Sequence, residues 1–100
     1  MSRFIYLYKG PSMEMTPEQG AKWGVWMGEI GAALLDEGAP CAGGTVVVDN
    51  GSSAKTSNVT GYSIIEAADL KAATALTKGN PLLSGNKGLY SIEVLELIEM

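Results

Sequence analysis

The first predicted element is a β-strand over residues 3–9, where aromatic and aliphatic side chains follow one another without a polar break. Successive side chains of a strand point to opposite faces, so Phe4, Tyr6 and Tyr8 share one face. The other face is also apolar. We therefore expect this strand to be covered on both sides.

The next segment has the periodicity of an amphipathic helix over residues 17–37. Thr16 is suited to accept from the first free amides, and Pro17 suits the first helical position. Gly38 is the expected terminator, because glycine readily adopts the left-handed conformation that ends helices. At 100° per residue the helix gathers one apolar stripe, made of Trp23, Met27, Ile30 and Leu34.

Three glycines, Gly24, Gly28 and Gly31, align beside this stripe. Each glycine destabilises a helix interior by about 1 kcal/mol relative to alanine, so the alignment calls for a reason. Close approach of another group is the usual one. That group is either a loop of the same chain, or a second subunit or bound molecule.

The remaining pattern predicts strands over residues 45–48, 59–67 and 89–98 and a second helix over residues 69–76, with a long loop at 52–57. The resulting β-α-β-β-α-β order predicts one α+β domain over residues 1–100. Its simplest arrangement is ferredoxin-like, with a four-stranded antiparallel sheet and both helices on one face.

Such a sheet leaves its second face bare. We expect this bare face to carry Phe4, Tyr6 and Tyr8, whose burial stabilises by about 1.5–3 kcal/mol each. An identical sheet from a second copy is the simplest cover. The sequence thus predicts a homodimer that pairs through its sheets as a dimeric α/β barrel.

Composition excludes several classes of function. The chain is 46% hydrophobic and 18% charged, as expected of a globular domain, and its net charge of −4 disfavours nucleic acid and anionic membranes as partners. It has no histidine and a single cysteine, Cys41, which removes histidine-based catalysis, ordinary zinc sites and internal disulfides. We expect no cofactor, no metal, no membrane segment and a cytoplasmic location.

Residues 22–28, 35–40, 60–67, 79–81 and 91–94 together resemble the YCII-related domain family, and most closely its small single-domain bacterial members. The blocks follow the family's order and spacing along nearly the whole chain. The resemblance implies a ferredoxin-like fold that dimerises through its sheets.

The family's functional motifs are not reproduced. The better-known branches resemble degradative enzymes in fold, and some of them carry a proposed His/Asp catalytic pair. Others carry an Asp-Gly-Pro-Phe motif near the third strand. This chain has no histidine, and residues 57–60 stand where the second motif is expected. Related members often have histidine at the position of Asn80, and asparagine cannot shuttle a proton near neutral pH.

Five residues are candidates for a binding site. Glu93 would be a general base if buried near Tyr6 and Tyr8, one of which would donate a hydrogen bond. Its alternative is an edge carboxylate that is solvated or paired with a basic side chain. Trp26 lies at the edge of the apolar stripe, where it either lines a pocket or packs in the core. Asn80 either contacts a ligand or shapes the turn before proline.

These observations predict a small-molecule-binding or accessory protein with a cavity between the two sheets of a homodimer, open to an apolar or aromatic ligand. One alternative is a cofactor-free lyase, isomerase or degradative enzyme acting on a small aromatic compound with Glu93 as base. Another is a structural or regulatory interaction module.

Overall fold

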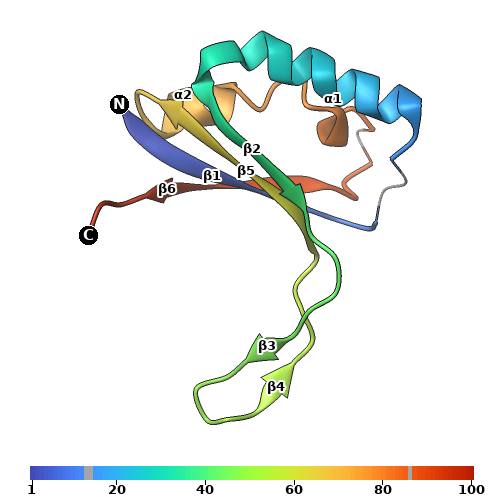
Figure 1. The fold of residues 1–100 in the computed structure, drawn as a ribbon, viewed down its shortest axis with the longest axis vertical. Coiled ribbons are helices and arrows are strands. Elements are labelled where there is room, and N and C mark those ends of the chain that lie inside the picture. Colours follow the sequence, from blue (N-terminus) through green and yellow to red (C-terminus); the bar gives the residue numbers. More distant parts are fainter. Residues whose placement is uncertain (13–14, 86) are drawn as a thin grey trace.

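The computed structural model describes residues 1–12, 15–85 and 87–100 (Figure 1). In chain order its helices and strands are β1 (Ser2–Lys9), α1 (Pro17–Ile30), β2 (Leu34–Pro40), β3 (Val46–Val47), β4 (Ser53–Ala54), β5 (Val59–Ala67), α2 (Leu70–Ala75) and β6 (Ser91–Leu97). Two short 3₁₀ turns, Gly31–Ala33 and Pro81–Leu83, follow α1 and α2.

The fold is α+β. Its main sheet has four antiparallel strands in the order β2-β5-β1-β6, and β3 pairs with β4 in a separate two-stranded sheet. Both helices lie over the same face of the main sheet (Figure 1). The predicted four-stranded antiparallel sheet with two helices is confirmed.

The first helix is shorter than predicted. It ends at Ile30, because Gly31 adopts a φ of +53° and its N–H donates to the carbonyl of Met27. Leu34, expected in the helix stripe, is instead the first residue of β2, which pairs with β5. Helical periodicity continued past Gly31 in the sequence, but the free edge of β5 offers this segment a ladder of backbone hydrogen bonds.

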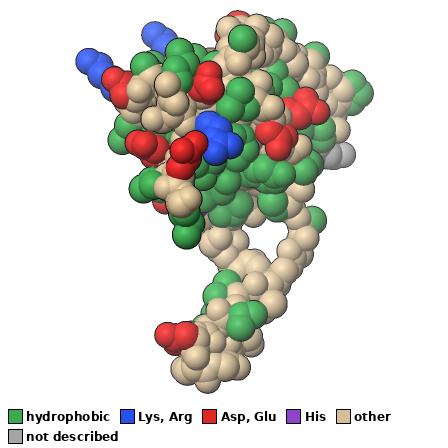
Figure 2. Space-filling view, turned by 60° about the vertical axis from the view of Figure 1, so that its left-hand side comes forward, with side chains coloured by type: hydrophobic (Ala, Val, Ile, Leu, Met, Phe, Trp, Pro, Cys, Tyr) green, Lys and Arg blue, Asp and Glu red, His purple; other side chains and the backbone are tan. Residues whose placement is uncertain are grey.

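The predicted strand over residues 45–48 does not belong to the main sheet. Only Val46–Val47 is extended, and it pairs with Ser53–Ala54 over two residue pairs. Because β2 occupies the position beside β5, the intervening segment forms a hairpin that projects from the body (Figures 1 and 2). Val47, within β3, is 81% exposed.

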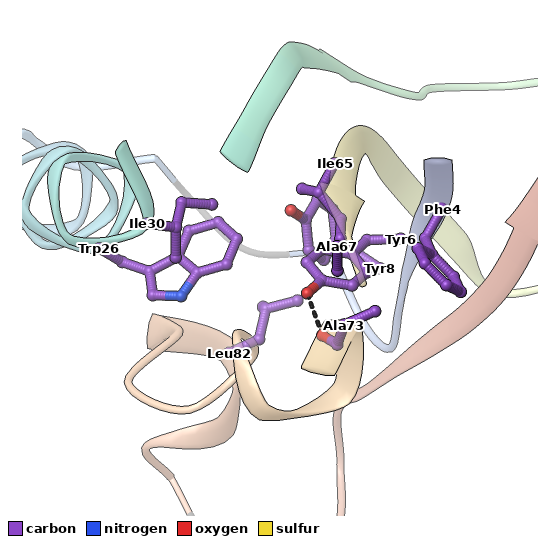
Figure 3. Packing of buried hydrophobic residues seen from close by; sticks show 9 residues of the cluster. All are labelled: Phe4, Tyr6, Tyr8, Trp26, Ile30, Ile65, Ala67, Ala73 and Leu82. Atoms are coloured by element: carbon purple, nitrogen blue, oxygen red, sulfur yellow. Dashed lines mark hydrogen bonds between the residues drawn. The ribbon is translucent and has the colours of Figure 1, made fainter. Parts of the chain in front are cut away.

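The aromatic face of β1 lies under the helices of its own chain. Phe4 and Tyr6 are fully buried, and Tyr8 is nearly so, in a core with Trp26 and Ile30 of α1 (Figure 3). The prediction that a second copy shields these rings is therefore wrong. Alternation along a strand defines two faces, but the helices decide which of them becomes the core.

The opposite face of the sheet carries aliphatic side chains. In the strand register Ile5 lies between Ile64 and Leu95, and Leu7 lies beside Tyr62. Within the described residues, no helix or strand covers this face (Figure 1). We call these five residues the open sheet face.

A helix that crosses a bilayer needs about 20 consecutive, mostly apolar residues. Among the residues that the structure describes, no helix is both long and apolar enough.

Candidate ligand-binding cleft

A cleft of about 370 Å³ lies on the helix side of the sheet, between α1 and the adjoining ends of β2 and β5. This volume is within the range of small-molecule pockets. The lining comes from three parts of the chain and from Tyr8: Met15, Gly20, Trp23, Gly24 and Met27; Glu37, Gly38, Ala39 and Pro40; and Thr60, Gly61, Tyr62 and Ser63.

One wall of the cleft is a single face of α1. Gly20, Trp23, Gly24 and Met27 follow the i, i+3, i+4, i+7 spacing that brings residues together on a helix. A Cβ built on Gly20 or Gly24 would meet no neighbouring atom within 4 Å. The two glycines therefore leave open space where other residues would project into the cleft.

The three aligned glycines of the predicted stripe have different roles in the structure. Gly24 lines the cleft, whereas Gly28 faces open space outside it and Gly31 ends the helix. Within the described chain no loop packs closely against any of the three. Of the two explanations considered, close approach of a loop is excluded for the described residues.

The second wall contains an irregularity in β2. The pairing of β2 with β5 shifts register on both sides of Asp36, and Gly38 has a φ of +72° there. The Gly38 N–H donates to Asp36 Oδ1 at 2.8 Å, and a Cβ on Gly38 would collide with the carbonyl oxygen of Tyr62. Bulges of this kind redirect a strand, and here the bulge shapes the rim of the cleft.

The polar part of the floor includes the hydroxyl groups of Tyr8 and Ser63. Tyr8 Oη donates to Ser63 Oγ at 2.8 Å, and Ser63 Oγ donates to the Glu37 carbonyl oxygen at 2.8 Å. Burial raises the pKa of Tyr8, although its hydrogen bond with Ser63 opposes the rise. The Tyr8 phenol is therefore neutral at physiological pH and is suited to hydrogen bonding.

Tyr6 lies deeper than Tyr8 and does not line the cleft. Its hydroxyl donates to the carbonyl of Ala73, so α2 is tied to the centre of the sheet (Figure 3). Burial, with a smaller contribution from the neighbouring Tyr8, raises the pKa of Tyr6 to about 12. We find a structural role for this side chain.

Trp26 is also a core residue, 1% exposed, and it lies behind Trp23. The two indoles meet edge to face with ring centroids 5.8 Å apart, and Trp23 meets Tyr8 in the same way at 5.1 Å. Trp26 Nε1 donates to the Leu76 carbonyl at 3.0 Å. Trp26 thus supports the cleft through Trp23, which lines it.

The structure separates Glu93 from the tyrosines. Glu93 lies opposite Leu7 in the strand register and therefore on the open sheet face, whereas Tyr6 and Tyr8 point to the helix side. Its Oε1 lies 2.6 Å from the Lys9 Nζ. The predicted grouping of Glu93 with the tyrosines is wrong, because paired residues of neighbouring strands share a face and adjacent residues do not.

Asn80 is 1% exposed but does not line the cleft. Its Oδ1 accepts from the Leu82 N–H at 2.9 Å and so caps the 3₁₀ turn of Pro81–Leu83. Its Nδ2 has no partner among the described residues. Of the two predictions for Asn80, the structure shows the one in which it shapes the turn.

Sequence reasoning missed several lining residues, although two signals were present. Gly20 extends the glycine spacing of α1 by one turn. Ser63 is the single hydroxyl residue on the buried face of β5, among Gly61, Ile65 and Ala67.

In the part of the chain that the structure describes, no group of His, Cys, Asp or Glu side chains is placed to hold a metal ion, and Cys41 is exposed.

The fold and the cleft define a small α+β protein with a pocket of ligand size. The model of the YCII-related domain matches residues 1–99, so the chain belongs to the YCII-related domain family. No curated protein and no solved structure matches it.

Proposed function

We propose that the protein binds a small apolar molecule in the cleft between α1, β2 and β5, as a binding or accessory protein of the YCII-related type. The carrying observation is the open glycine face of α1. Two glycines inside a helix cost about 2 kcal/mol together relative to alanine, and no packing within the described chain requires them. A ligand bound in the cleft would explain the two glycines, because larger side chains there would occupy its space.

The character of the lining supports an apolar ligand. Trp23, Met15 and Met27 contribute aromatic and thioether surface, and Pro40 continues it on the strand side. Methionine side chains adapt to irregular shapes and contact aromatic rings favourably. Few polar groups accompany them, as is usual where a pocket holds an apolar body in one orientation.

This proposal replaces the cavity expected between the sheets of a dimer. The replacement is supported by Tyr6, Tyr8 and Trp26, which lie under the helices of their own chain. It also leaves the alternative of an enzyme with Glu93 as base without support, because the sheet lies between that carboxylate and the cleft.

Gly24→Leu tests the cleft. The Cβ of a residue there meets no protein atom within 4 Å, and a leucine side chain would occupy part of the cleft. We expect the affinity for the neutral fluorescent probe N-phenyl-α-naphthylamine to fall by about tenfold or more. The free energy of unfolding should rise by about 1 kcal/mol, because leucine favours the helix. Fluorescence titration and urea denaturation measure the two effects.

Gly28→Leu is the matched control. It lies on the same helix, its Cβ also meets no neighbouring atom, and it does not line the cleft. It should stabilise the helix similarly and leave probe affinity unchanged. Glu93→Gln, across the sheet, should also leave it unchanged. Equal probe affinity in Gly24→Leu and the unmodified protein would contradict the proposal.

We further propose that the chain is a ferredoxin-like homodimer that pairs through the open sheet face. The strand order β2-β5-β1-β6 supports the ferredoxin-like arrangement. The pairing is supported by the row of aliphatic side chains at Ile5, Ile64 and Leu95, which no described element covers. A two-fold axis would bring this row against itself.

Ile64→Glu tests the pairing. It would bring two carboxylates into the centre of the apolar interface, and we expect the dimer dissociation constant to rise by about a hundredfold or more. Light scattering over a concentration series measures it. Leu70→Glu is the control, because Leu70 is 53% exposed on α2, on the helix side. A monomeric unmodified protein at micromolar concentration would overturn the proposed dimer.

A further inference from the structure

We infer that the cleft selects ligands that donate a hydrogen bond and carry no negative charge, that is, apolar amines in neutral or cationic form. The inference rests on the proposed binding in the cleft and adds the chemical class of its ligand. It is carried by the direction of the hydrogen bonds in the floor and by the charges around the rim.

The direction of the floor hydrogen bonds is determined by the final acceptor. The Glu37 carbonyl oxygen can only accept, so the proton between it and Ser63 Oγ belongs to Ser63. Ser63 has no second proton and must accept from Tyr8 Oη, which uses the phenol proton. Both hydroxyl protons are thereby engaged, and the hydroxyl of Thr60 donates to the Tyr8 carbonyl oxygen at 3.3 Å. Ser63 is fully buried, so the acceptor left for a ligand is the oxygen of Tyr8, a lining residue that is 6% exposed.

The other N–H groups identified around the cleft are engaged or covered. The Gly38 N–H donates to Asp36 Oδ1, and the Gly20 N–H donates to the carbonyl of Thr16. Trp23 Nε1 has no hydrogen-bond partner among the described residues, but this atom is buried and does not reach the surface of the cleft. The described lining therefore favours a donor on the ligand.

The charges at the rim act in the same direction. Glu37 is the acidic residue of the lining, and no lysine or arginine belongs to the described lining. Lys9 lies 2.6 Å from Glu93 on the other side of the sheet. The exposed carboxylate of Glu37 at the rim repels anions and attracts cations, and added salt weakens this effect.

The two properties define one class of ligand. An amine nitrogen donates to the lone pairs of the floor, and when protonated it is also attracted by the carboxylate at the rim. A carboxylate or sulfonate on the same apolar body finds acceptors where it needs donors. The indole of Trp23 can pack against a flat ring of the ligand, whether the ligand carries an amine or an acidic group.

Two probes that share one chromophore test the inference. N-phenyl-α-naphthylamine is neutral and carries one N–H, and anilinonaphthalene sulfonate adds a negative charge to the same rings. We expect the neutral probe to bind at least about tenfold more tightly in fluorescence titrations. Benzylammonium should displace it at concentrations at least about tenfold lower than benzoate.

Two variants assign the selection to its residues. Glu37→Gln should reduce the ratio of the two probes' affinities severalfold. Glu96→Gln, at an exposed position of β6, should leave this ratio unchanged. Ser63→Ala frees the Tyr8 proton and should improve displacement by benzoate. Circular dichroism of each variant confirms that it folds.

The outcomes separate this inference from the proposed function. If both probes bind equally, and Gly24→Leu weakens both, the cleft binds ligands and the inference about their class is overturned. If the sulfonate binds more tightly, the inference is likewise overturned. If neither probe binds, the proposed function fails, and the inference fails with it.

Discussion

Replacing Gly38 by alanine is expected to lower the free energy of unfolding by about 2–5 kcal/mol. Gly38 has a φ of +72°, where an L-residue with a Cβ costs about 1–2 kcal/mol. The added Cβ would also collide with the carbonyl oxygen of Tyr62, and relieving such overpacking costs about 1–3 kcal/mol more. Urea denaturation followed by circular dichroism measures the loss.

Gly43→Ala separates the two causes. Gly43 has a similar φ of +62°, but a Cβ there would meet no neighbouring atom within 4 Å. It should therefore lose only the backbone contribution, about 1–2 kcal/mol. Equal losses at the two positions would show that β5 moves away from Gly38 without cost. Gly38→Ala should also bind N-phenyl-α-naphthylamine more weakly than the unmodified protein, because Gly38 lines the cleft.

Trp26→Ala is expected to destabilise the protein by about 3–5 kcal/mol, as large aromatic truncations in cores do. Trp26 is 1% exposed and joins α1 to the sheet through its contact with Tyr6, at 6.3 Å between ring centroids. It also joins α1 to the segment after α2 through its hydrogen bond to Leu76. The free energy of unfolding of a small domain is about 5–15 kcal/mol, so this variant would lose much of the native stability.

Val25→Ala is the control for this truncation. Val25 is the neighbouring residue of α1 and is 63% exposed, so removing its side chain should change stability by less than about 0.5 kcal/mol. Both substitutions lie in α1, and both introduce alanine. A comparable loss in both would mean that α1 contributes by its helical propensity and not through the core contacts of Trp26.

Local patterns in the sequence were sufficient for several elements. The apolar run at residues 3–9 and the β-branched segment at 59–67 became β1 and β5, the two central strands. Thr16 caps α1 as expected, with its side chain accepting from the Gln19 N–H. These features depend on nearest neighbours along the chain, so sequence alone contains their causes.

The second strand shows where local reasoning stops. Residues 34–37 continue the helical spacing of α1, yet they form the first part of β2 because Gly31 ends the helix and β5 offers a free edge. The valines at 46–47 have the stronger strand propensity but lie in the projecting hairpin. Pairing with a strand distant in sequence outweighed local preference in both places.

The site divides in the same manner. The glycine spacing on α1 and the absence of histidine are properties of the sequence. They already indicated a helix face approached by a loop, a second subunit or a bound molecule, and a chemistry without imidazole. The location of the cleft was not predictable, because it requires α1 to lie beside β2 and β5. Glu93 illustrates the difference: its face on β6 was one of two choices, and the register with Leu7 decided it.

The amino-acid sequence by itself determined the class of the fold, the ends of most elements and the set of side chains available for chemistry, since these follow from local sterics and composition. Only the tertiary structure decided that the rings of Tyr6 and Tyr8 lie beneath the helices and the aliphatic residues remain on the open sheet face. The physical reason is that both faces of β1 are apolar, so the choice depended on how the whole chain packs.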